Sequence, residues 1–484
     1  MINSNANASF NRQLSKRLVF WGISLAIAFS YSVLAFQADL RLSIPTLVGV
    51  SALIMALLSI ALYLGETRAM GWSPWVIIVG AVAFRLMFLF RTPELSDDIY
   101  RYLWDGLTIL HGTNPYALAP ADAKLFDTGS AALLSHVNHP HLVTLYPPAA
   151  QIFFAIGAFL GGITGLKVLL VALDIAVCVI IMRILAYLKM PPSRALLYAW
   201  HPLPILEIAA SGHIDGAGIF FLMLAFLLLL LRQNSTYPLF ARNGWTPAVA
   251  GAAFSFAALV KLFPLVFFPV FLFLVGKKGW WRFALGATIG ATALSVPFFP
   301  DIFNMLITLD IYVRNWEFAG FAFQSLHEIF PSGQTARQIL AAAFLLIMAA
   351  LYAVLLRKRN NPVEADYPSS LWRAAFQAAY CIVLAFLLLT PTLHPWYALY
   401  LACLLPFVPG VAGLVMTWAV LLSYRVLINF TLLGVWEEND AIPTLIWGAA
   451  VGALMLGWFI RKHRPSFLCG KASTVLPEIR SRCG

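Results

Sequence analysis

Windows of about 20 consecutive apolar residues, the length that spans the hydrocarbon core of a bilayer as one helix, recur along this chain from near its N-terminus to its C-terminal tail. Apolar residues make up 61% of the 484 positions and charged residues 11%, whereas ordinary soluble domains carry roughly 25% charged residues. Because a backbone in lipid must satisfy its own hydrogen bonds, every such window is predicted to be helical. The pattern excludes a soluble fold and predicts an all-α, polytopic transmembrane helical bundle.

The apolar segments predict a bundle of about 13 to 14 spans. They lie near 18–36, 46–64, 74–90, 166–188, 195–210, 217–231, 247–260, 262–275, 283–299, 339–356, 374–389, 396–407, 411–430 and 442–460. A further apolar stretch, 148–162, is short and is bounded by proline and glycine pairs. It is predicted to be a re-entrant or interfacial helix, because that choice leaves the basic clusters at the span ends on the cytoplasmic side, as the positive-inside rule expects.

This topology divides the chain into six parts, with both termini in the cytoplasm. They are the N-terminal tail with the first three spans (1–91), an extracytoplasmic loop with an acidic motif and the re-entrant helix (92–165), central spans (166–299), an extracytoplasmic loop (300–338), C-terminal spans (339–460) and a cytoplasmic tail (461–484). The net charge of +11 comes from basic residues at span ends, which predicts membrane lipids as partners and excludes nucleic acid. Most acids and most of the nine histidines fall outside, so chemistry is predicted on the extracytoplasmic side.

The strongest candidate for chemistry is the run 96–106, Ser-Asp-Asp-Ile-Tyr-Arg-Tyr-Leu-Trp-Asp-Gly, just after the third span. If it is helical, four side chains three and four positions apart share one face: Asp98, Arg101, Tyr102 and Asp105. Adjacent carboxylates raise each other's pKa and suit proton abstraction from a hydroxyl, so Asp97 and Asp98 are the candidate catalytic residues. The alternative is a solvated helix cap, with Ser96 or Asp97 at the N-cap and Arg101 paired with a neighbouring acid.

Further polar motifs follow on the same predicted side and would line a pocket at the membrane interface. The pocket-lining candidates are Asp105, Tyr116, His139, His141, Tyr146, His213 and Asp215. A metal site at the histidines near 136–141 is disfavoured, because Pro140 interrupts helical spacing and no acid or cysteine is adjacent. No metal site is assigned, no cofactor is predicted to be required, and dependence on a divalent metal stays open. Glu207, inside a predicted span, is either a site residue or a buried acid satisfied by a neighbouring helix.

Two motifs near predicted span ends carry a cation and a histidine. Lys261 begins Lys-Leu-Phe-Pro, and His394 begins His-Pro-Trp-Tyr. A cation at Lys261 would hold a lipid phosphate at the headgroup level, or it would extend to water without a ligand.

Six motifs occur in this order along the chain: the acidic pair, Asn-Pro-Tyr, Tyr-Pro-Pro, Gly-His-Ile-Asp, Lys-Leu-Phe-Pro and His-Pro-Trp-Tyr. Together they resemble the GT-C superfamily of membrane glycosyltransferases. Within it the chain is most similar to glycosyltransferase family 87 and the related polyprenol-phosphate-mannose-dependent mannosyltransferases of bacteria, over roughly 74–400. The resemblance implies a GT-C bundle in the bacterial inner (cytoplasmic) membrane, with a large extracytoplasmic first loop that carries amphipathic or re-entrant helices. It also implies transfer of a hexose, expected to be mannose, from a polyprenyl-phosphate donor to an extracytoplasmic glycan, lipid or glycolipid acceptor with inversion.

The resemblance also assigns roles to residues of the outer face. The general base maps onto Asp97 or Asp98, with Asp97 slightly favoured. The leaving phosphate would be held by Lys261, Arg101, Arg314 or His394. Two spans more than in many relatives precede the acidic loop, and the role of this extra pair is open.

A multispan transporter or lipid flippase is the alternative from another class, since it would also carry polar residues near broken helices. The sequence has no internal repeat, and most of its charges lie at the outer rim, which favours an enzyme. Asp174 and Glu207, both inside predicted spans, are the features that favour a transporter. A different membrane enzyme, such as an acyltransferase, is a further alternative.

Overall fold

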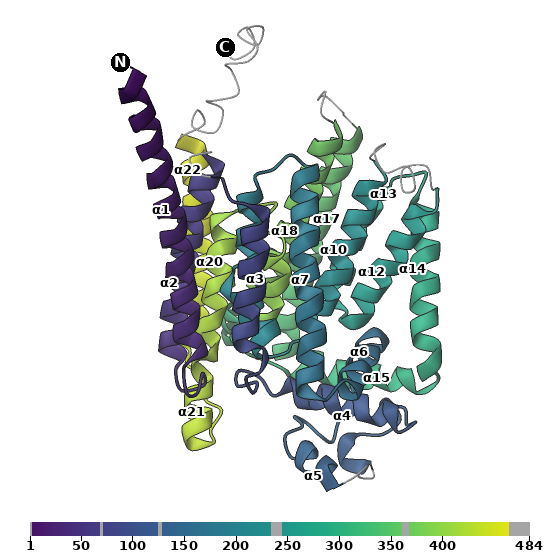
Figure 1. The fold of residues 1–484 in the computed structure, drawn as a ribbon. Helices are drawn as coiled ribbons and strands as arrows, with labels where there is room; N and C mark the ends of the chain where they lie inside the picture. Colours follow the sequence, from purple (N-terminus) through teal and green to yellow (C-terminus); the bar gives the residue numbers. More distant parts are fainter. Residues whose placement is uncertain (1, 68–70, 124–127, 234–243, 361–366, 464–484) are drawn as a thin grey trace.

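A computed structural model of the chain describes residues 2–67, 71–123, 128–233, 244–360 and 367–463, and Figure 1 shows them as a bundle of helices. Over these ranges the backbone is helical or irregular, apart from isolated β-bridges that join Thr392 to Phe318 and Ala319. The all-α, polytopic fold predicted from the sequence is confirmed. Of the predicted C-terminal tail, residues 464–484 lie outside the described part of the chain.

Seven helical segments within the described ranges are long and apolar enough to cross a bilayer. They lie in α1 (Ile2–Ala35), α2 (Ile44–Glu66), α7 (Ile163–Tyr187), α17 (Gly333–Asn360), α18 (Tyr367–Leu389), the run of α20 (Val411–Ala419), η8 (Val420–Arg425) and α21 (Val426–Leu433), and α22 (Ala441–His463). A bent pair, Trp280–Phe298 and Asp301–Asn315, makes an eighth span if its two arms, which meet at 103°, count as one. It contains α14 (Trp280–Ser295), η5 (Val296–Phe298), η6 (Asp301–Phe303) and α15 (Asn304–Asn315).

Shorter apolar helices complete the bundle, and most of them run alongside the long ones (Figure 1). They are α3 (Pro74–Leu89), α6 (Pro148–Phe159), α10 (Asp215–Leu231), α12 (Thr246–Val260), and η4 (Phe263–Phe267) continued by α13 (Phe268–Val275). The remaining elements are α4 (Asp98–Leu110), η1 (Pro120–Asp122), α5 (Thr128–Leu134), η2 (Pro192–Ala195), α8 (Leu196–Ala199), α9 (Pro202–Pro204), η3 (Ile205–Ala210), α16 (Phe321–Ile329), η7 (Pro395–Ala398) and α19 (Leu399–Ala402).

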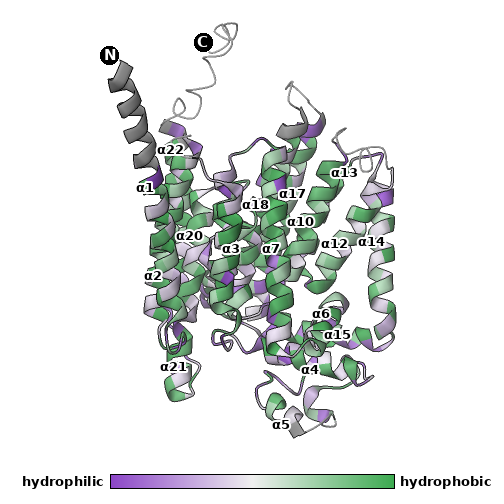
Figure 2. Cartoon of the chain, in the orientation of Figure 1, coloured by the Kyte–Doolittle hydropathy of each residue, from purple (hydrophilic) through white to green (hydrophobic). Residues whose placement is uncertain are grey.

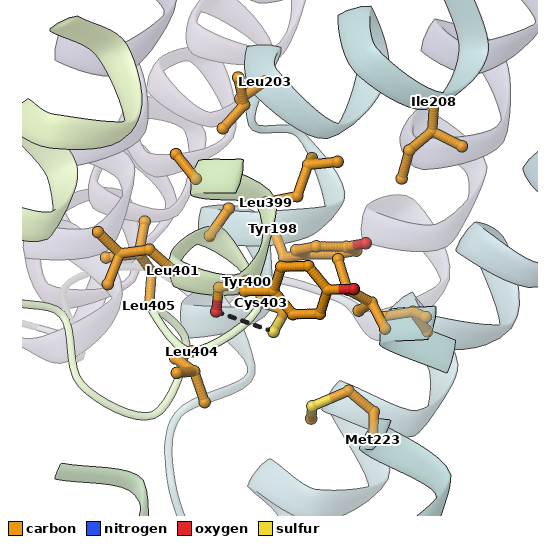
Figure 3. Close-up of a cluster of buried hydrophobic side chains, with 14 of the residues drawn as sticks. Tyr198, Leu203, Ile208, Met223, Leu399, Tyr400, Leu401, Cys403, Leu404 and Leu405 are labelled. Carbon is orange, nitrogen blue, oxygen red and sulfur yellow. Dashed lines mark hydrogen bonds between the residues drawn. The ribbon is translucent and has the colours of Figure 1, made fainter. Parts of the chain in front are cut away.

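The predicted number of 13 to 14 spans is corrected, because several apolar segments form helices shorter than a full span and two do not form continuous helices. Segment 195–210 breaks into α8, α9 and the π-helix η3, where Pro202 and Pro204 remove backbone donors. Segment 396–407 contains only part of η7 and α19 before it continues as turns. Figure 3 shows the second segment packed among buried side chains such as Tyr198 and Met223. Irregular backbone is tolerated there because protein, not lipid, surrounds it.

One end of the bundle carries the predicted outer elements. Helices α4, α5, α6 and α15 lie at this end, whereas α1 begins and α22 ends at the opposite end (Figure 1). Helix α4 packs closely on α6, since a Cβ at Gly106 would lie 2.3 Å from the carbonyl oxygen of Phe154. Helix α6 has 12 residues, which cover about 18 Å, less than the roughly 30 Å of hydrocarbon. Its length agrees with the predicted re-entrant or interfacial helix.

Figure 2 shows that the helices of the bundle consist mostly of hydrophobic residues along their height. Large apolar side chains such as Phe29 of α1, Leu346 of α17 and Trp458 of α22 are exposed. A continuous cluster of buried apolar residues extends from Ile23 on α1 to Ala453 on α22. Because apolar side chains cover the outside as well as the core, the molecule is an integral membrane protein.

A buried ion pair fixes the middle of the bundle. The Nε of Arg85 on α3 lies 2.6 Å from the carboxylate of Asp174 on α7, and the hydroxyl of Tyr198 donates to the same carboxylate at 2.6 Å. Arg85 also donates to the carbonyl oxygen of Ala199. Asp174, which favoured a transporter in the sequence, is thus a paired side chain that joins α3, α7 and α8.

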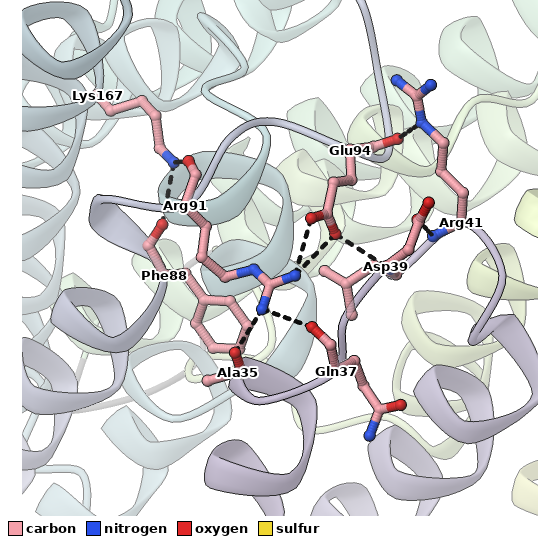
Figure 4. A network of polar contacts seen from close by, with 9 residues as sticks. Ala35, Gln37, Asp39, Arg41, Phe88, Arg91, Glu94 and Lys167 are labelled. Carbon is pink, nitrogen blue, oxygen red and sulfur yellow. Dashed lines mark hydrogen bonds and ion pairs between the residues drawn. The ribbon is translucent and has the colours of Figure 1, made fainter.

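The first two helices are tied to the acidic loop through the network in Figure 4. The carboxylate of Glu94 accepts from Arg91 at 2.8 Å and from the backbone N–H of Leu40 at 2.8 Å. Arg91 also donates to the carbonyl of Gln37, and Lys167 of α7 donates to the carbonyl of Arg91. The loop between α1 and α2 therefore holds the segment that precedes Asp97, which gives this helix pair a structural role.

Candidate active site

Asp98 is the first residue of α4, and its carboxylate faces three side chains. Its Oδ2 atom lies 3.3 Å from the hydroxyl of Tyr146, 3.5 Å from that of Tyr102 and 3.9 Å from the Nδ1 of His213. The Oγ of Ser96 accepts from the Asp98 backbone N–H at 3.2 Å, and Asp97 is the N-cap residue of α4, without a side-chain hydrogen bond to the helix. The Asp98 side chain keeps 25% of its surface exposed, and its carboxylate can therefore meet a ligand.

Asp97 has different surroundings, although it is the neighbouring residue. Its carboxylate accepts a hydrogen bond of 2.7 Å from Arg41, which lies in the loop between α1 and α2. Arg41 also donates to the carbonyl oxygen of Glu94. The two acids predicted to act as a pair thus have separate partners, and Asp97 is neutralised by an arginine.

Lys261 supplies a cation to the same end of the bundle. It caps the C-terminus of α12, and its Nζ lies 2.7 Å from the carboxylate of Asp215 at the start of α10. The ammonium also lies 5.4 Å from the ring centroid of Tyr397 and 5.9 Å from that of Trp396. The Lys261 side chain is 18% exposed, whereas Asp215 is fully buried. Asp215 therefore holds the ammonium in place, while part of the Lys261 side chain stays exposed.

A stack of rings connects the motifs at 212–215 and 394–397. The ring of His213 stacks on Trp396 at 4.1 Å, Trp396 on His394 at 4.3 Å, and His394 on Phe318 at 4.9 Å between centroids. These rings come from three separate parts of the chain. They give the cluster around Asp98 and Lys261 a rigid aromatic side.

The charges of this cluster act on one another. Burial raises the pKa of Asp98, and the positive charge of Lys261 partly opposes that rise. Burial, followed by the charge of Lys261, lowers the pKa of His213 well below its ordinary value and that of His394 to about 3. The two histidines are therefore neutral at neutral pH, and Lys261 carries the positive charge near Asp98.

The two predicted arginine contacts of the phosphate are each paired with an acid on their own helix. Arg101 is buried and its Nε donates to Asp105 at 2.9 Å on the same helix. Arg314 pairs with Asp310 on α15, and its side chain is 62% exposed. Of the four residues predicted to hold a phosphate, Lys261 and His394 are brought to the cluster, and only Lys261 is charged there.

The predicted pocket-lining residues divide into two groups. Tyr146, His213 and Asp215 contact Asp98 or Lys261 directly. The others have different partners: Asp105 on α4 accepts from Gln151, Tyr116 donates to the carbonyl of Tyr146, and His139 packs on Trp316 with His141 beside it. Burial, followed by the charges of His141 and Arg101, lowers the pKa of His139.

Several side chains at the site were missed by sequence reasoning. Tyr424 donates to both oxygens of Glu207 at 2.8 and 2.9 Å. Tyr312 of α15 shares a hydrogen bond of 2.6 Å with Tyr397. Tyr424 lies in a long apolar run, where a single tyrosine hydroxyl gives little indication of its partner. Arg41 was missed because its only local context is a short loop between two spans.

A cavity of about 370 Å³ lies beside the end of the ring stack that is formed by Phe318. Its polar lining residues are Ser423, Arg425, Asn429, Glu437, Glu438, Asn439 and Asp440. Among the residues that the structure describes, no group of three or more His, Cys, Asp or Glu side chains is placed to hold a metal ion.

The fold defines a class, a polytopic membrane protein, and the candidate site places a partly open carboxylate and a held ammonium at one end of its bundle. Residues 25–277, just over half of the 484, match the family model described as alpha-(1→6)-mannopyranosyltransferase, N-terminal domain. The chain therefore belongs to this family and is a membrane mannosyltransferase, which confirms the resemblance drawn from its motifs. The matched range includes Asp98, His213, Asp215 and Lys261. No curated protein and no solved structure matches the chain.

Proposed function

We propose that this protein transfers mannose from a polyprenyl-phosphate-linked donor to a hydroxyl group of an extracytoplasmic glycan, lipid or glycolipid, and forms the α-(1→6) linkage that the family description names. One observation carries the proposal: the partly open carboxylate of Asp98 lies 3.9 Å from the Nδ1 of His213, whose ring stacks on Trp396, and the ammonium of Lys261 lies 5.9 Å from the centroid of that same Trp396 ring. The positive charge of Lys261 is the main one that opposes the raised pKa of Asp98. A base and a phosphate-binding cation are what such a transfer needs.

Asp98 is the proposed general base. The acceptor hydroxyl gives its proton to the Asp98 carboxylate while its oxygen forms a bond to C1 of the mannose. The bond between C1 and the phosphate oxygen breaks, and the electron pair leaves with the lipid phosphate. A carboxylate with a raised pKa is better suited to this step than an ordinary one. Asp97, slightly favoured by sequence, is engaged by Arg41 and is assigned a positioning role.

Lys261 is the proposed contact of the leaving phosphate. Its ammonium is fixed by Asp215 and by the faces of Tyr397 and Trp396, so little reorganisation is needed when charge develops on the phosphate. A single displacement inverts the anomeric carbon. An α-linked product therefore requires a β-linked mannosyl phosphate as the donor.

The acceptor is proposed to approach from the side of the 370 Å³ cavity that borders Phe318. Glu437, Glu438 and Asp440 on its wall accept hydrogen bonds, as sugar hydroxyls require, and Asn429 both donates and accepts. These three carboxylates outnumber Arg425 on the wall of the same cavity, so the cavity disfavours an anionic donor. This separates the acceptor side from the lipid phosphate at Lys261.

The end that bears α4 and α15 is proposed to face outward from a bacterial cytoplasmic membrane. Basic clusters such as 277–278 and 357–359 lie at or beyond helix ends on the opposite side of the bundle (Figure 1), where the positive-inside rule places the cytoplasm. The transporter alternative is not carried forward, because both Asp174 and Glu207 have tyrosine or arginine partners in the fold.

The test is transfer of labelled mannose from β- and α-linked mannosyl polyprenyl phosphate to a glycolipid acceptor by purified protein in lipid nanodiscs. We expect wild type to use only the β-linked donor. Asp98→Asn should lose about 10²- to 10⁴-fold in kcat, the usual contribution of a general base, and Lys261→Met should raise the KM for the donor and lower kcat.

Asp97→Asn is expected to keep activity within several-fold of wild type, and Asp122→Asn, an exposed acid of the same loop, serves as the matched control. Full activity of Asp98→Asn would remove the assigned base. Absence of transfer by wild type from either donor anomer would reject the proposed function.

A further inference from the structure

Behind Asp98 lies a buried chain of polar groups that the proposed reaction does not use. The Nδ1 of His213 is 3.9 Å from the Asp98 carboxylate, and its Nε2 is 3.3 Å from the Oε2 of Glu207. Glu207 in turn accepts from the hydroxyl of Tyr424 at 2.8 and 2.9 Å. Glu207 is fully buried and His213 is 1% exposed. Asp98 is therefore the member of the chain that reaches the open site.

Local backbone structure places these groups. Glu207 lies in the π-helix η3, an uncommon element that is often found at functional sites. Gly212, with φ +76°, turns the chain after η3, and a Cβ there would lie 2.6 Å from the Cδ1 of Ile99 on α4. The backbone N–H of His213 donates to the carbonyl of Glu207 at 2.9 Å, and Trp396 covers one face of the imidazole. The ring is thus held between two carboxylates.

The two nitrogens of His213 lack a hydrogen bond of good geometry to any residue in the described part of the chain. Buried polar groups are nearly always hydrogen-bonded, so a ring in this position is expected to gain a partner in some state of the enzyme. A neutral imidazole has one N–H and one lone pair. If Nε2 carries the proton and points it at Glu207, Nδ1 can only accept.

An ionised Asp98 has no proton to offer Nδ1, which agrees with the separation of 3.9 Å. Once Asp98 has taken the proton of the acceptor hydroxyl, its O–H can donate to Nδ1. We propose that Glu207 is a positioning residue that fixes this tautomer of His213, and that His213 then accepts the hydrogen bond of protonated Asp98 and stabilises the base in its product state. The inference rests on the proposed function, because it assumes that Asp98 is the base.

The proton is conserved in this scheme. It moves from the acceptor oxygen to Asp98, is shared with His213 Nδ1, and passes to water when the product leaves. Other charged and titratable groups face the chain. Asp98 also interacts with Lys261, Tyr146, Asp215, Asp97 and Tyr102. His213 also interacts with Lys261 and His394. Glu207 also interacts with Asp215 and Lys261. The charge of Lys261 disfavours a second positive charge on His213, so the ring stays a neutral acceptor.

The decisive variant is Glu207→Gln, measured by kcat and KM as functions of pH in the nanodisc assay. An amide can donate to Nε2, which reverses the tautomer and points Nδ1–H at Asp98. That hydrogen bond favours the ionised carboxylate. We expect kcat to fall by about 10- to 100-fold, the acid limb of the pH profile to move to lower pH, and the KM values of donor and acceptor to stay within about three-fold of wild type.

A second pair of variants covers the case in which Glu207→Gln does not fold. Tyr424→Phe removes the hydrogen bonds that the tyrosine hydroxyl donates to Glu207, so both oxygens of Glu207 become available to the Nε2–H of His213. We expect its acid limb to move to higher pH, opposite to that of Glu207→Gln. The matched control is Tyr198→Phe, which removes the same kind of bond to the buried Asp174 away from the site; it should change thermal stability and leave the pH profile unchanged.

An acid limb that stays at the wild-type pH in Glu207→Gln would overturn the proposal, as would identical pH profiles for Tyr424→Phe and Tyr198→Phe. A loss of activity that appears only as a higher KM would also overturn it. If wild type transfers mannose and the pH profile of Glu207→Gln is unchanged, this inference is rejected and the proposed function stands. Absence of transfer by wild type rejects the proposed function and the inference with it.

Discussion

Asp97 and Asp98 are adjacent in the chain, but α4 begins between them, and their carboxylates meet different partners. The carboxylate of Asp97 pairs with Arg41. The carboxylate of Asp98 lies close to Tyr146, Tyr102 and His213. At this scale the electrostatic difference is decisive. Asp97 accepts a hydrogen bond from a guanidinium, whereas Asp98 lies beside tyrosine and histidine side chains, and burial raises the pKa of Asp98.

The raised pKa of Asp98 predicts a pH dependence of the wild-type reaction. The base acts when it is ionised, so kcat/KM should fall as the pH decreases through the pKa of Asp98 in the free enzyme. Because burial raises that pKa, the acid limb should lie above the ordinary value of about 3.9. The measurement is log(kcat/KM) for mannosyl transfer against pH.

Asp97→Asn should move this limb slightly to lower pH, because the charge of Asp97 contributes to the rise. An acid limb at or below about 3.9 in wild type would contradict the assignment of Asp98 as the base.

At the scale of elements, α4 depends on α6 for its position. The helix carries Asp98 and Tyr102 on one side, and Tyr102 stacks on Phe154 of α6 with ring centroids 4.5 Å apart. Gly106 allows this approach, since any side chain there would meet the Phe154 carbonyl. The short helix α6 thus acts as a support for the acidic motif, which is a role that its length alone does not reveal.

Gly106→Ala is predicted to separate α4 from α6. The added methyl group would lie 2.3 Å from the carbonyl oxygen of Phe154, and overpacking of this kind typically costs about 1 to 3 kcal/mol. We expect a lower melting temperature together with a lower kcat, because Asp98 moves with α4. Thermal unfolding and the transfer assay measure the two effects.

The matched control is Gly49→Ala on α2, where an added Cβ has nothing within 4 Å. It should leave both quantities unchanged or raise stability slightly, as alanine favours a helix. Equal stability of the two variants would show that the contact between α4 and α6 is not as tight as described.

At the scale of the whole molecule, buried polar pairs join helices that are distant in sequence. Arg85 and Asp174 connect α3 to α7, and Tyr424 reaches Glu207 across 217 positions. Breaking a buried ion pair leaves one charge without a partner in a medium of low dielectric constant, which costs far more than losing a pair at the surface.

Asp174→Asn is therefore predicted to destabilise the bundle by about 3 to 5 kcal/mol, whereas Glu66→Gln, which breaks the more exposed pair with Arg194, should cost less than about 1 kcal/mol. Thermal unfolding in detergent compares them. The double variant Arg85→Met/Asp174→Leu should recover much of the loss. If Asp174→Asn is as stable as Glu66→Gln, the pair has no structural role.

The sequence by itself determined the membrane class, the helical fold and the motifs of the outer face, because apolar windows and turn-forming residues are local patterns. It also identified Asp98, His213, Asp215 and Lys261 as part of a larger set. Only the tertiary structure decided the rest. It showed that Asp97, unlike Asp98, pairs with Arg41, which lies 56 positions before it in the chain. It also showed that two apolar segments are broken and buried inside the bundle. These outcomes depend on packing between residues far apart in the chain, and such contacts leave no periodic pattern in the sequence.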